Sequence, residues 1–167
     1  LLGAQAVIAA ERIGGEIRSA YKKYFNEAFS IDFIKKAQNN PAFLIDFVIK
    51  EIKISSTGNY SRNPLTPKGT HELKVADEIS RDIYFVALCR SFGIPAHIDP
   101  ATKIPGYYKN GVWKDVYFET RTTDNIPKAK LTLTFDTSSI DFKPLYYSHF
   151  TIEKFDAGFY RSLDYEE

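Results

Sequence analysis

Apolar residues recur at helical spacing through the first part of the chain. Over residues 4–29 they return at steps of three and four, with charged residues between them, which predicts a helix. Gly14 and Gly15 lie inside this stretch. Each glycine costs about 1 kcal/mol relative to alanine in a helix interior. The pattern therefore predicts a helix over 4–29 and leaves a break at the two glycines open.

Two shorter helices are expected next. Ser30 can cap a helix over 31–38, because its hydroxyl can accept from a free N–H of the first turn. A proline suits the first turn of a helix, which favours a second helix over Pro41–Ile52. Residues 55–69 are rich in Ser, Asn, Pro and Gly, and this composition predicts a long surface loop.

The strongest predicted helix covers residues 76–92. Asp77 or Ser80 can cap its start. Its middle, Ile83–Cys89, is apolar on every side rather than along one stripe. A helix of that kind is buried all round, so it is expected at the centre of the core.

The central helix is expected to stop at Gly93, which suits a left-handed C-terminal position, and Pro95 prevents its continuation. Short strands are predicted to follow, and Asn110-Gly111 is a typical two-residue hairpin turn. The predicted strands cover 94–99, 107–108 and 112–119.

The last quarter of the chain alternates apolar and polar residues with period two, which is typical of half-buried strands. Residues 126–167 are therefore predicted to form a β-meander, the edge of the same domain or the start of a β-sandwich. Residues 1–125 form the main predicted domain. The alternating segments are 131–136, 145–155 and 158–165, with a tight turn at Asp156-Ala157-Gly158.

Composition narrows the function classes. The 22 basic and 21 acidic residues give a net charge of +1, which argues against a nucleic-acid binder. One cysteine excludes an intramolecular disulfide framework and a cysteine-rich zinc site. The histidines His71, His97 and His149 have no metal-ligand spacing, so no metal or cofactor is expected. No stretch reaches the roughly 18 apolar residues of a membrane span.

A sequence signature lies at the end of the central helix. Residues 80–96 resemble the core of the transglutaminase-like superfamily, in which a central helix ends in Arg-x-Leu-Gly-Ile-Pro-Ala-Arg. The corresponding residues here are Arg-Ser-Phe-Gly-Ile-Pro-Ala-His, residues 90–97. The resemblance implies a papain-like α+β core with N-terminal helices, a buried central helix and an antiparallel sheet, followed by further strands. It also implies a bacterial protein that is secreted, periplasmic or on the cell surface.

The family's nucleophile is a cysteine at the start of the central helix, where the helix dipole favours thiolate. The resemblance puts that position about 15 residues before the glycine of the signature. Counting back reaches Glu78, with Asp77 and Ser80 beside it, and no cysteine. Cys89 lies among apolar neighbours inside the helix and is expected to be structural. A serine nucleophile at Ser80 with His71 as its base is the weaker possibility.

The family's base and orienting residue are also altered. The resemblance implies a histidine on a strand after the signature and an aspartate on the next strand. No histidine lies between Asp99 and Asp136, whereas Trp113 and Asp115 match the later strand. His97 takes the family's arginine position and is expected to be a packing or surface residue.

The resemblance therefore implies a domain with a degenerate triad that binds peptide or glycan without amide turnover. The alternatives are an active amide hydrolase or acyl-transferase with an altered or missing nucleophile, and a structural spacer. The predicted binding site is a cleft between the helix start and the hairpin. Its expected residues are Asp77, Glu78, Ser80, Arg81, Trp113 and Asp115, and the weak catalytic candidates are Glu78, Ser80, His71 and Asp115.

Overall fold

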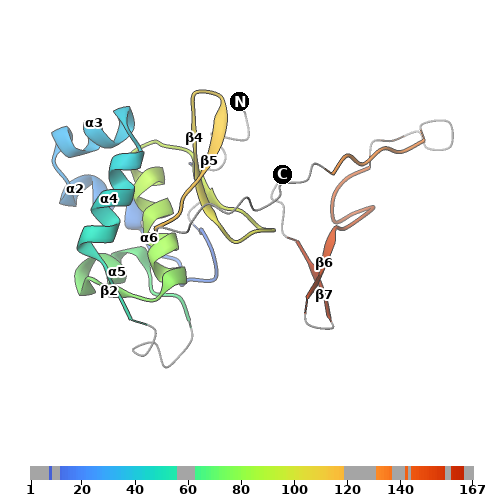
Figure 1. Cartoon of the computed structure of the whole chain (residues 1–167), viewed down its shortest axis with the longest axis horizontal. Helices are drawn as coiled ribbons and strands as arrows, with labels where there is room; N and C mark the ends of the chain where they lie inside the picture. Colours follow the sequence, from blue (N-terminus) through green and yellow to red (C-terminus); the bar gives the residue numbers. More distant parts are fainter. Residues whose placement is uncertain are drawn as a thin grey trace. The chain divides into compact units, whose positions relative to one another are not determined.

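A computed structural model describes residues 8, 12–55, 63–118, 131–136, 142, 144–156 and 159–163. The chain divides into two compact units, Leu1–Phe118 and Glu119–Glu167. Helices and small sheets occur together, so the fold belongs to the α+β class (Figure 1). The predicted domain boundary after residue 125 lies outside the described residues.

The first unit holds helices and two small sheets. Its helices are α2 (Tyr21–Ala28), α3 (Ile31–Asn39), α4 (Ala42–Glu51), α5 (Pro67–Leu73) and α6 (Glu78–Ser91). Its strands are β1 (Lys53–Ile54), β2 (Val75–Ala76), β3 (Ala96–Ile98), β4 (Pro105–Lys109) and β5 (Val112–Asp115). Strands β1 and β2 pair in parallel, whereas β3, β4 and β5 form an antiparallel sheet in that order.

The first predicted helix is much shorter than expected. Only Tyr21–Ala28 is helical within residues 12–29, and residues 12–20 are irregular. Glu16 explains this difference, because its buried carboxylate accepts hydrogen bonds from the backbone N–H groups of Ile13 and Gly14 at 2.8 and 2.7 Å. Those bonds replace the helical ones that two glycines would have weakened. The prediction of one helix over 4–29 is therefore wrong across residues 12–20.

The next two helices agree with the sequence. The Ser30 hydroxyl accepts from the N–H of Phe33 at 3.2 Å and caps α3, and Pro41 directly precedes α4. The predicted loop over 55–69 is wrong from Pro67 onward, where α5 begins. Thr66 caps α5 by accepting from the N–H of Gly69 at 3.1 Å, and Pro67 takes the first helical position. Residues 56–62 of that loop lie outside the described residues.

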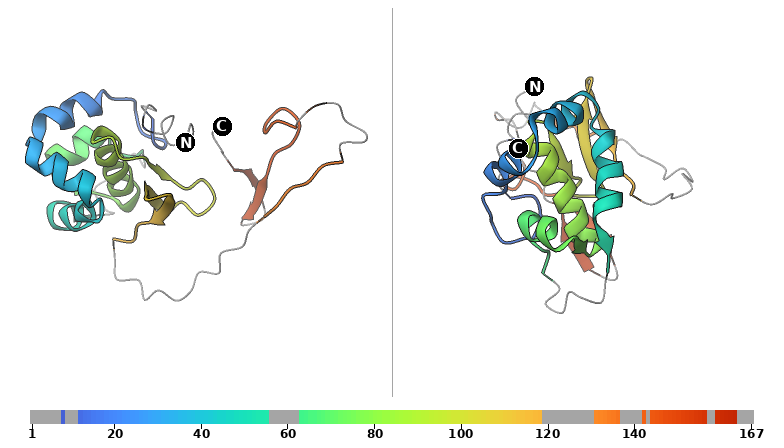
Figure 2. Two further views of the ribbon diagram at one scale, coloured as in Figure 1. Left: turned by 90° about the horizontal axis from the view of Figure 1, so that it is seen from above. Right: turned by 90° about the vertical axis from the view of Figure 1, so that its left-hand side faces the viewer.

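Helix α6 is the centre of the first unit. Every residue from Ile83 to Arg90 is buried, as the all-round apolar pattern predicts. Val86, Leu88 and Cys89 are completely inaccessible to solvent. Helices α2, α4 and α5 contact one side of α6, and β3 and β4 contact the other (Figures 1 and 2). This layering means that α6 supplies packing surface to both the helices and the sheet.

The end of α6 and the hairpin after it were predicted correctly. Gly93 has a φ of +75°, the left-handed value that a glycine accepts easily, and it directs the chain toward β3. Asn110 and Gly111 have φ values of +52° and +84° and join β4 to β5. Two consecutive positive φ values are typical of a type I′ turn.

The observed strands differ from the predicted ones in length. Strand β3 covers 96–98 of the predicted 94–99, β4 extends beyond the predicted 107–108, and β5 stops at Asp115 rather than at residue 119. The last backbone bond of the hairpin runs from the N–H of Val116 to the carbonyl of Pro105 at 2.8 Å. Pro105 has no N–H to return a bond, so the ladder ends there.

The second unit contains a hairpin of β6 (Glu153–Asp156) and β7 (Phe159–Ser162), which pair antiparallel. This hairpin agrees with part of the predicted meander, and the tip of its turn lies outside the described residues. Residues 131–136 are exposed and form no strand, which corrects that part of the prediction. The side chains of Phe155 and Tyr160 lie opposite each other, 5.0 Å apart, and both are exposed.

Candidate functional site

At the start of α6, the side chains of Asp77 and Ser80 accept hydrogen bonds from nearby backbone N–H groups. Asp77 is the cap, and its Oδ1 accepts from the N–H of Ser80 at 2.7 Å. The Ser80 hydroxyl is buried and accepts from the N–H of Leu65 at 2.9 Å. Glu78 is exposed. Ser80 therefore fixes the segment before α5 instead of presenting its hydroxyl at the surface.

Arg81 lies in the first turn of α6 and packs against the segment that follows β5. Its guanidinium is 4.4 Å from the centre of the Phe118 ring, and its Nε is 3.3 Å from Oδ1 of Asp82. The residue is only 8% exposed. A guanidinium over an aromatic face is held by the electrons of the ring as well as by the carboxylate. Arg81 thus joins the first turn of α6 to the segment that follows β5.

Cys89 lies in the middle of the core. The residue is fully buried, and burial raises the pKa of its thiol well above the ordinary value, because the thiolate would lose its hydration. The positive charge of Arg90 lowers the pKa by a smaller amount. A thiol of this kind stays protonated at neutral pH and is a poor nucleophile.

We expect native protein to react slowly with iodoacetamide at neutral pH, since alkylation needs an accessible thiolate. The reaction is measured by intact mass over time, with urea-unfolded protein as the comparison. Cys89→Ala should fold with a modest loss of stability. Rapid and complete alkylation of the folded protein would contradict the structural role of Cys89.

His71 lies in an aromatic cluster rather than beside Ser80. Its Nδ1 is 2.8 Å from the hydroxyl of Tyr84, and its ring packs against Phe25 and Phe29 at centroid distances of 5.6 and 5.3 Å. Burial raises the pKa of Tyr84, so this hydroxyl keeps its proton and can donate it to a neutral imidazole. The geometry therefore gives His71 a packing role and does not pair it with Ser80.

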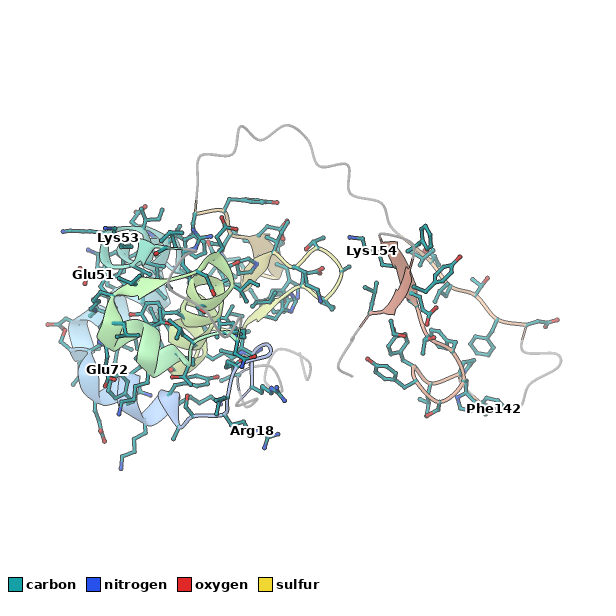
Figure 3. The ribbon with its side chains drawn as sticks, turned by 90° about the horizontal axis from the view of Figure 1, so that it is seen from below. Arg18, Glu51, Lys53, Glu72, Phe142 and Lys154 are labelled. Atoms are coloured by element: carbon teal, nitrogen blue, oxygen red, sulfur yellow. The ribbon has the colours of Figure 1, made fainter. Side chains whose placement is uncertain are left out.

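A positive charge on His71 would be unfavourable in this buried aromatic cluster. Burial lowers its pKa, and Lys74 lowers it further. Glu51 at the end of α4 and Glu72 on α5 raise it, and these acidic residues lie on the same side of the unit (Figure 3). Because burial dominates, the folded protein binds a proton at His71 less readily than the unfolded chain does.

The first unit should therefore lose stability as the pH falls below about 6.5, the pKa of an unperturbed histidine. The stabilisation is complete above that value, because there His71 is neutral in both states, and it is lost as the pH falls toward the lowered pKa of the folded state. His71→Gln should make the unfolding free energy, measured by urea titration, depend less steeply on pH; the part that remains comes from His97, whose pKa burial also lowers. His149→Gln in the second unit is the control and should leave the curve unchanged.

The sheet has an outer face that points away from α6. Ala96 and Tyr107 are paired neighbours, both are buried, and Tyr107 contacts Phe85 of α6 with ring centroids 6.5 Å apart. Side chains alternate between the two faces of a sheet. The adjacent row therefore belongs to the outer face, and it consists of His97, Gly106 and Asp115.

An aromatic stack covers this outer face. The rings of His97 and Trp113 are 3.9 Å apart and inclined by only 12°, and the Tyr108 ring meets Trp113 edge-on at 5.5 Å. Trp113 remains 37% exposed. Gly106 lies between the strands of the stacked residues, and a Cβ atom there would approach the carbonyl of Lys114 to 3.2 Å. The glycine therefore permits close strand pairing and leaves space over which the rings stack.

His97 lies between two carboxylates. Burial lowers its pKa, the negative charges of Asp99 and Asp115 raise it, and the positive charge of Arg90 lowers it. Asp99 is partly buried, which raises its pKa, but hydrogen bonds from Thr102 and neighbouring backbone more than offset this and keep it ionised. The outer face thus combines a neutral stacked imidazole with negative charge.

The predicted site residues therefore fall into two groups on opposite faces of the sheet. Ser80 and Arg81 lie on the α6 side, whereas Trp113 and Asp115 lie on the outer face. They do not meet in a single groove. The sequence did not reveal His97 and Asp99 as neighbours of Trp113. The pairing of strands around the Asn110-Gly111 turn could have placed Tyr108 opposite Trp113.

Within the described ranges, no three His, Cys, Asp or Glu side chains gather to hold a metal ion. In the same ranges, every helix is too short or too polar to cross a membrane. Comparison of the chain with protein-family models, with curated proteins and with solved structures finds no match.

Proposed function

We propose that the first unit is a transglutaminase-like domain that has lost its catalytic triad and binds a ligand without amide turnover. Support for the fold comes from α6. This helix is buried on all sides, ends at a left-handed Gly93 and leads through Pro95 into an antiparallel sheet that packs on it. The same order of elements is what the Gly-Ile-Pro signature implies.

The absence of turnover is argued from the chemistry at the helix start. Ser80 is buried and bonded to the backbone of Leu65, and Cys89 is buried with a raised pKa. Glu78 is exposed, but a carboxylate is a weak nucleophile toward an amide without further activation. His71 is held by Tyr84 and the aromatic cluster. None of these groups is paired with a base in the way that nucleophilic catalysis requires.

Binding is assigned to the outer face of the sheet, and the stack of His97 on Trp113 is the observation that carries it. An exposed indole with polar neighbours suits both classes of ligand that the sequence predicts. A sugar ring or a peptide side chain can lie on the indole, and nearby carboxylates can accept hydrogen bonds from it. A secreted, periplasmic or cell-surface location remains part of this proposal through the resemblance alone.

The test is a panel of glutamine-containing peptides and cell-wall or other glycan fragments, scored for binding by calorimetry and for release of ammonia. We expect binding without ammonia. Trp113→Ala should weaken it at least tenfold, equivalent to about 1.4 kcal/mol. Val112→Ala is the matched control, because this exposed residue lies on the same strand but on the other face.

Two results would decide against the proposal. Ammonia release that disappears in Ser80→Ala or Glu78→Ala would show an active amide hydrolase or acyl-transferase. Failure of every peptide and glycan to bind would favour a structural spacer. Circular dichroism of each variant must match the parent protein, so that a loss of binding reports the site and not the fold.

A further inference from the structure

The outer face of the sheet carries an inference about the chemistry of the ligand, and it rests on the proposed function. We infer that the face binds a basic peptide, with the ammonium or guanidinium group of a lysine or arginine side chain seated on Trp113 beside Asp99 and Asp115. The basis of this choice is the juxtaposition of an exposed indole with Asp115 on the same face of the β3–β4–β5 sheet and with Asp99 directly after the end of β3.

The indole is presented in a defined orientation. His97 stacks on Trp113 at 3.9 Å with a 12° inclination, and Tyr108 lies against it edge-on. These contacts fix the ring plane, while 37% of the residue stays exposed. A cation over an indole face is attracted by the ring electrons, and tryptophan is the strongest aromatic partner for it. Because the indole ring is already fixed, binding of a ligand does not carry the entropy cost of immobilising that side chain.

The two acidic residues reach the stack from different directions. Asp99 follows His97 by two residues, directly after the end of β3, and its Oδ1 accepts from the backbone N–H groups of Ala101 and Thr102. Asp115 stands in the same cross-strand row as His97, beyond Gly106, and it follows Trp113 by two residues. In keeping with these positions, the negative charge of both carboxylates raises the pKa of His97.

Within the described part of the chain, three basic residues near the outer face are directed elsewhere. Lys109 Nζ donates to the carbonyls of Gln38 and Asn39 at 2.9 and 3.3 Å, at the end of α3. Lys114 pairs with Tyr107, so it belongs to the opposite face of the sheet. Arg90 is buried and donates to the carbonyl of Ala96. Lys103 is exposed in the turn between β3 and β4. Among the residues that the structure describes, those that strand register places on the outer face are aromatic, acidic or glycine, and this face complements a cation.

A cation explains this arrangement better than a neutral sugar does. Both can stack on the indole, but only the cation gains from the negative charge of two carboxylates. The two ligands also differ in salt dependence, because attraction between exposed charges weakens as the ionic strength rises. Stacking of a neutral ring does not depend on that attraction.

Trp113 is the only tryptophan in the chain, so its fluorescence reports this face directly. Three ligands are titrated into the full chain: a peptide with one central lysine, the same peptide with that lysine acetylated, and a neutral oligosaccharide. We expect the lysine peptide to bind about tenfold more tightly than the acetylated one. Its Kd should rise with salt.

Three variants test whether the lysine peptide binds on the outer face of the sheet. Asp115→Asn keeps the shape of the side chain and removes its charge. It should therefore weaken binding of the lysine peptide and leave the affinity for the acetylated peptide unchanged. Lys114→Gln, on the opposite face of the same strand, is the matched control and should not reduce binding. Calorimetry replaces fluorescence for Trp113→Ala, which should abolish binding of the lysine peptide.

Acid should weaken binding of the lysine peptide as well. Protonated His97 would itself be a cation facing Asp99, Asp115 and Arg90, and it would repel the ligand. His97→Gln should remove this loss between neutral and mildly acidic pH.

Equal affinity for the lysine and acetylated peptides, or tighter and salt-independent binding of the oligosaccharide, would overturn the inference while the proposed function stands. Binding of none of the three ligands would also overturn the inference, and it would overturn the proposed function as well if every peptide and glycan of the first panel failed to bind.

Discussion

Leu88→Ala should lower the free energy of unfolding of the first unit by about 2–5 kcal/mol. Leu88 is completely buried in α6, between the helices and the sheet. Its truncation removes apolar contacts and leaves a cavity, since groups packed on both sides of α6 can relax only in part. Trp113 lies in this unit and is the only tryptophan, so its fluorescence during urea unfolding measures the change.

Ile79→Ala is the control for this experiment. Ile79 is in the first turn of the same helix but is 61% exposed, so its truncation should change stability by no more than about 0.5 kcal/mol. A cost below about 1 kcal/mol for Leu88→Ala would contradict the central position of α6.

Arg90→Met is the second change with a large expected effect. The guanidinium of Arg90 is buried, and it donates to the carbonyls of Ala96 at 2.8 Å and Arg12 at 3.0 Å. Methionine keeps the apolar stem but leaves the buried Ala96 carbonyl without this donor. Loss of a partner for a buried polar group costs about 1–3 kcal/mol. We expect a loss in that range by urea unfolding.

Arg90→Lys separates charge from geometry. Lysine keeps the positive charge but has one ammonium group in place of a planar fork, so it cannot reproduce both bonds. It should be destabilised nearly as much as Arg90→Met. Lys35→Met on the exposed side of α3 is the control, with an expected change within about 0.5 kcal/mol. Full stability of Arg90→Met would show that these bonds are dispensable.

The sequence was sufficient wherever one local rule dominated. The apolar run Ile83–Cys89 predicted a buried helix because no polar face was available for solvent. The helix end predicted at Gly93 and the hairpin turn predicted at Asn110-Gly111 were correct, because the left-handed backbone there excludes most other residues. The Ser30 cap depends only on contacts within one turn, which spacing alone describes.

The errors come from side chains that compete with a periodic pattern. Glu16 bonds the backbone around Gly14, and no apolar spacing reveals a carboxylate that folds back on its own segment. Helix α5 was hidden by loop-like composition, although Thr66 before Pro67 is a typical helix start. This helix is held against α6, so tertiary packing outweighs its weak propensity.

The candidate site was half predictable. The sequence singled out Trp113 and Asp115, and they do lie on one face of β5. The error was to place them opposite the start of α6. In β5, apolar and charged residues occur on both faces, so alternation could not show which face is turned toward the core. The position of β5 at the side of the sheet farther from α6 becomes visible only when β3, β4 and β5 are paired.

The last buried residues of the first unit also limit when it can fold. Val116 and Phe118 are buried in the core, and they come after every helix and strand of that unit. During synthesis the chain leaves the ribosome from its N-terminus, at about 5–20 residues per second. Until Phe118 emerges, Arg81 and Phe85 lack the ring against which they pack. A nascent chain that stops before Val116 would therefore expose part of its apolar core, and this intermediate is one on which a chaperone could act.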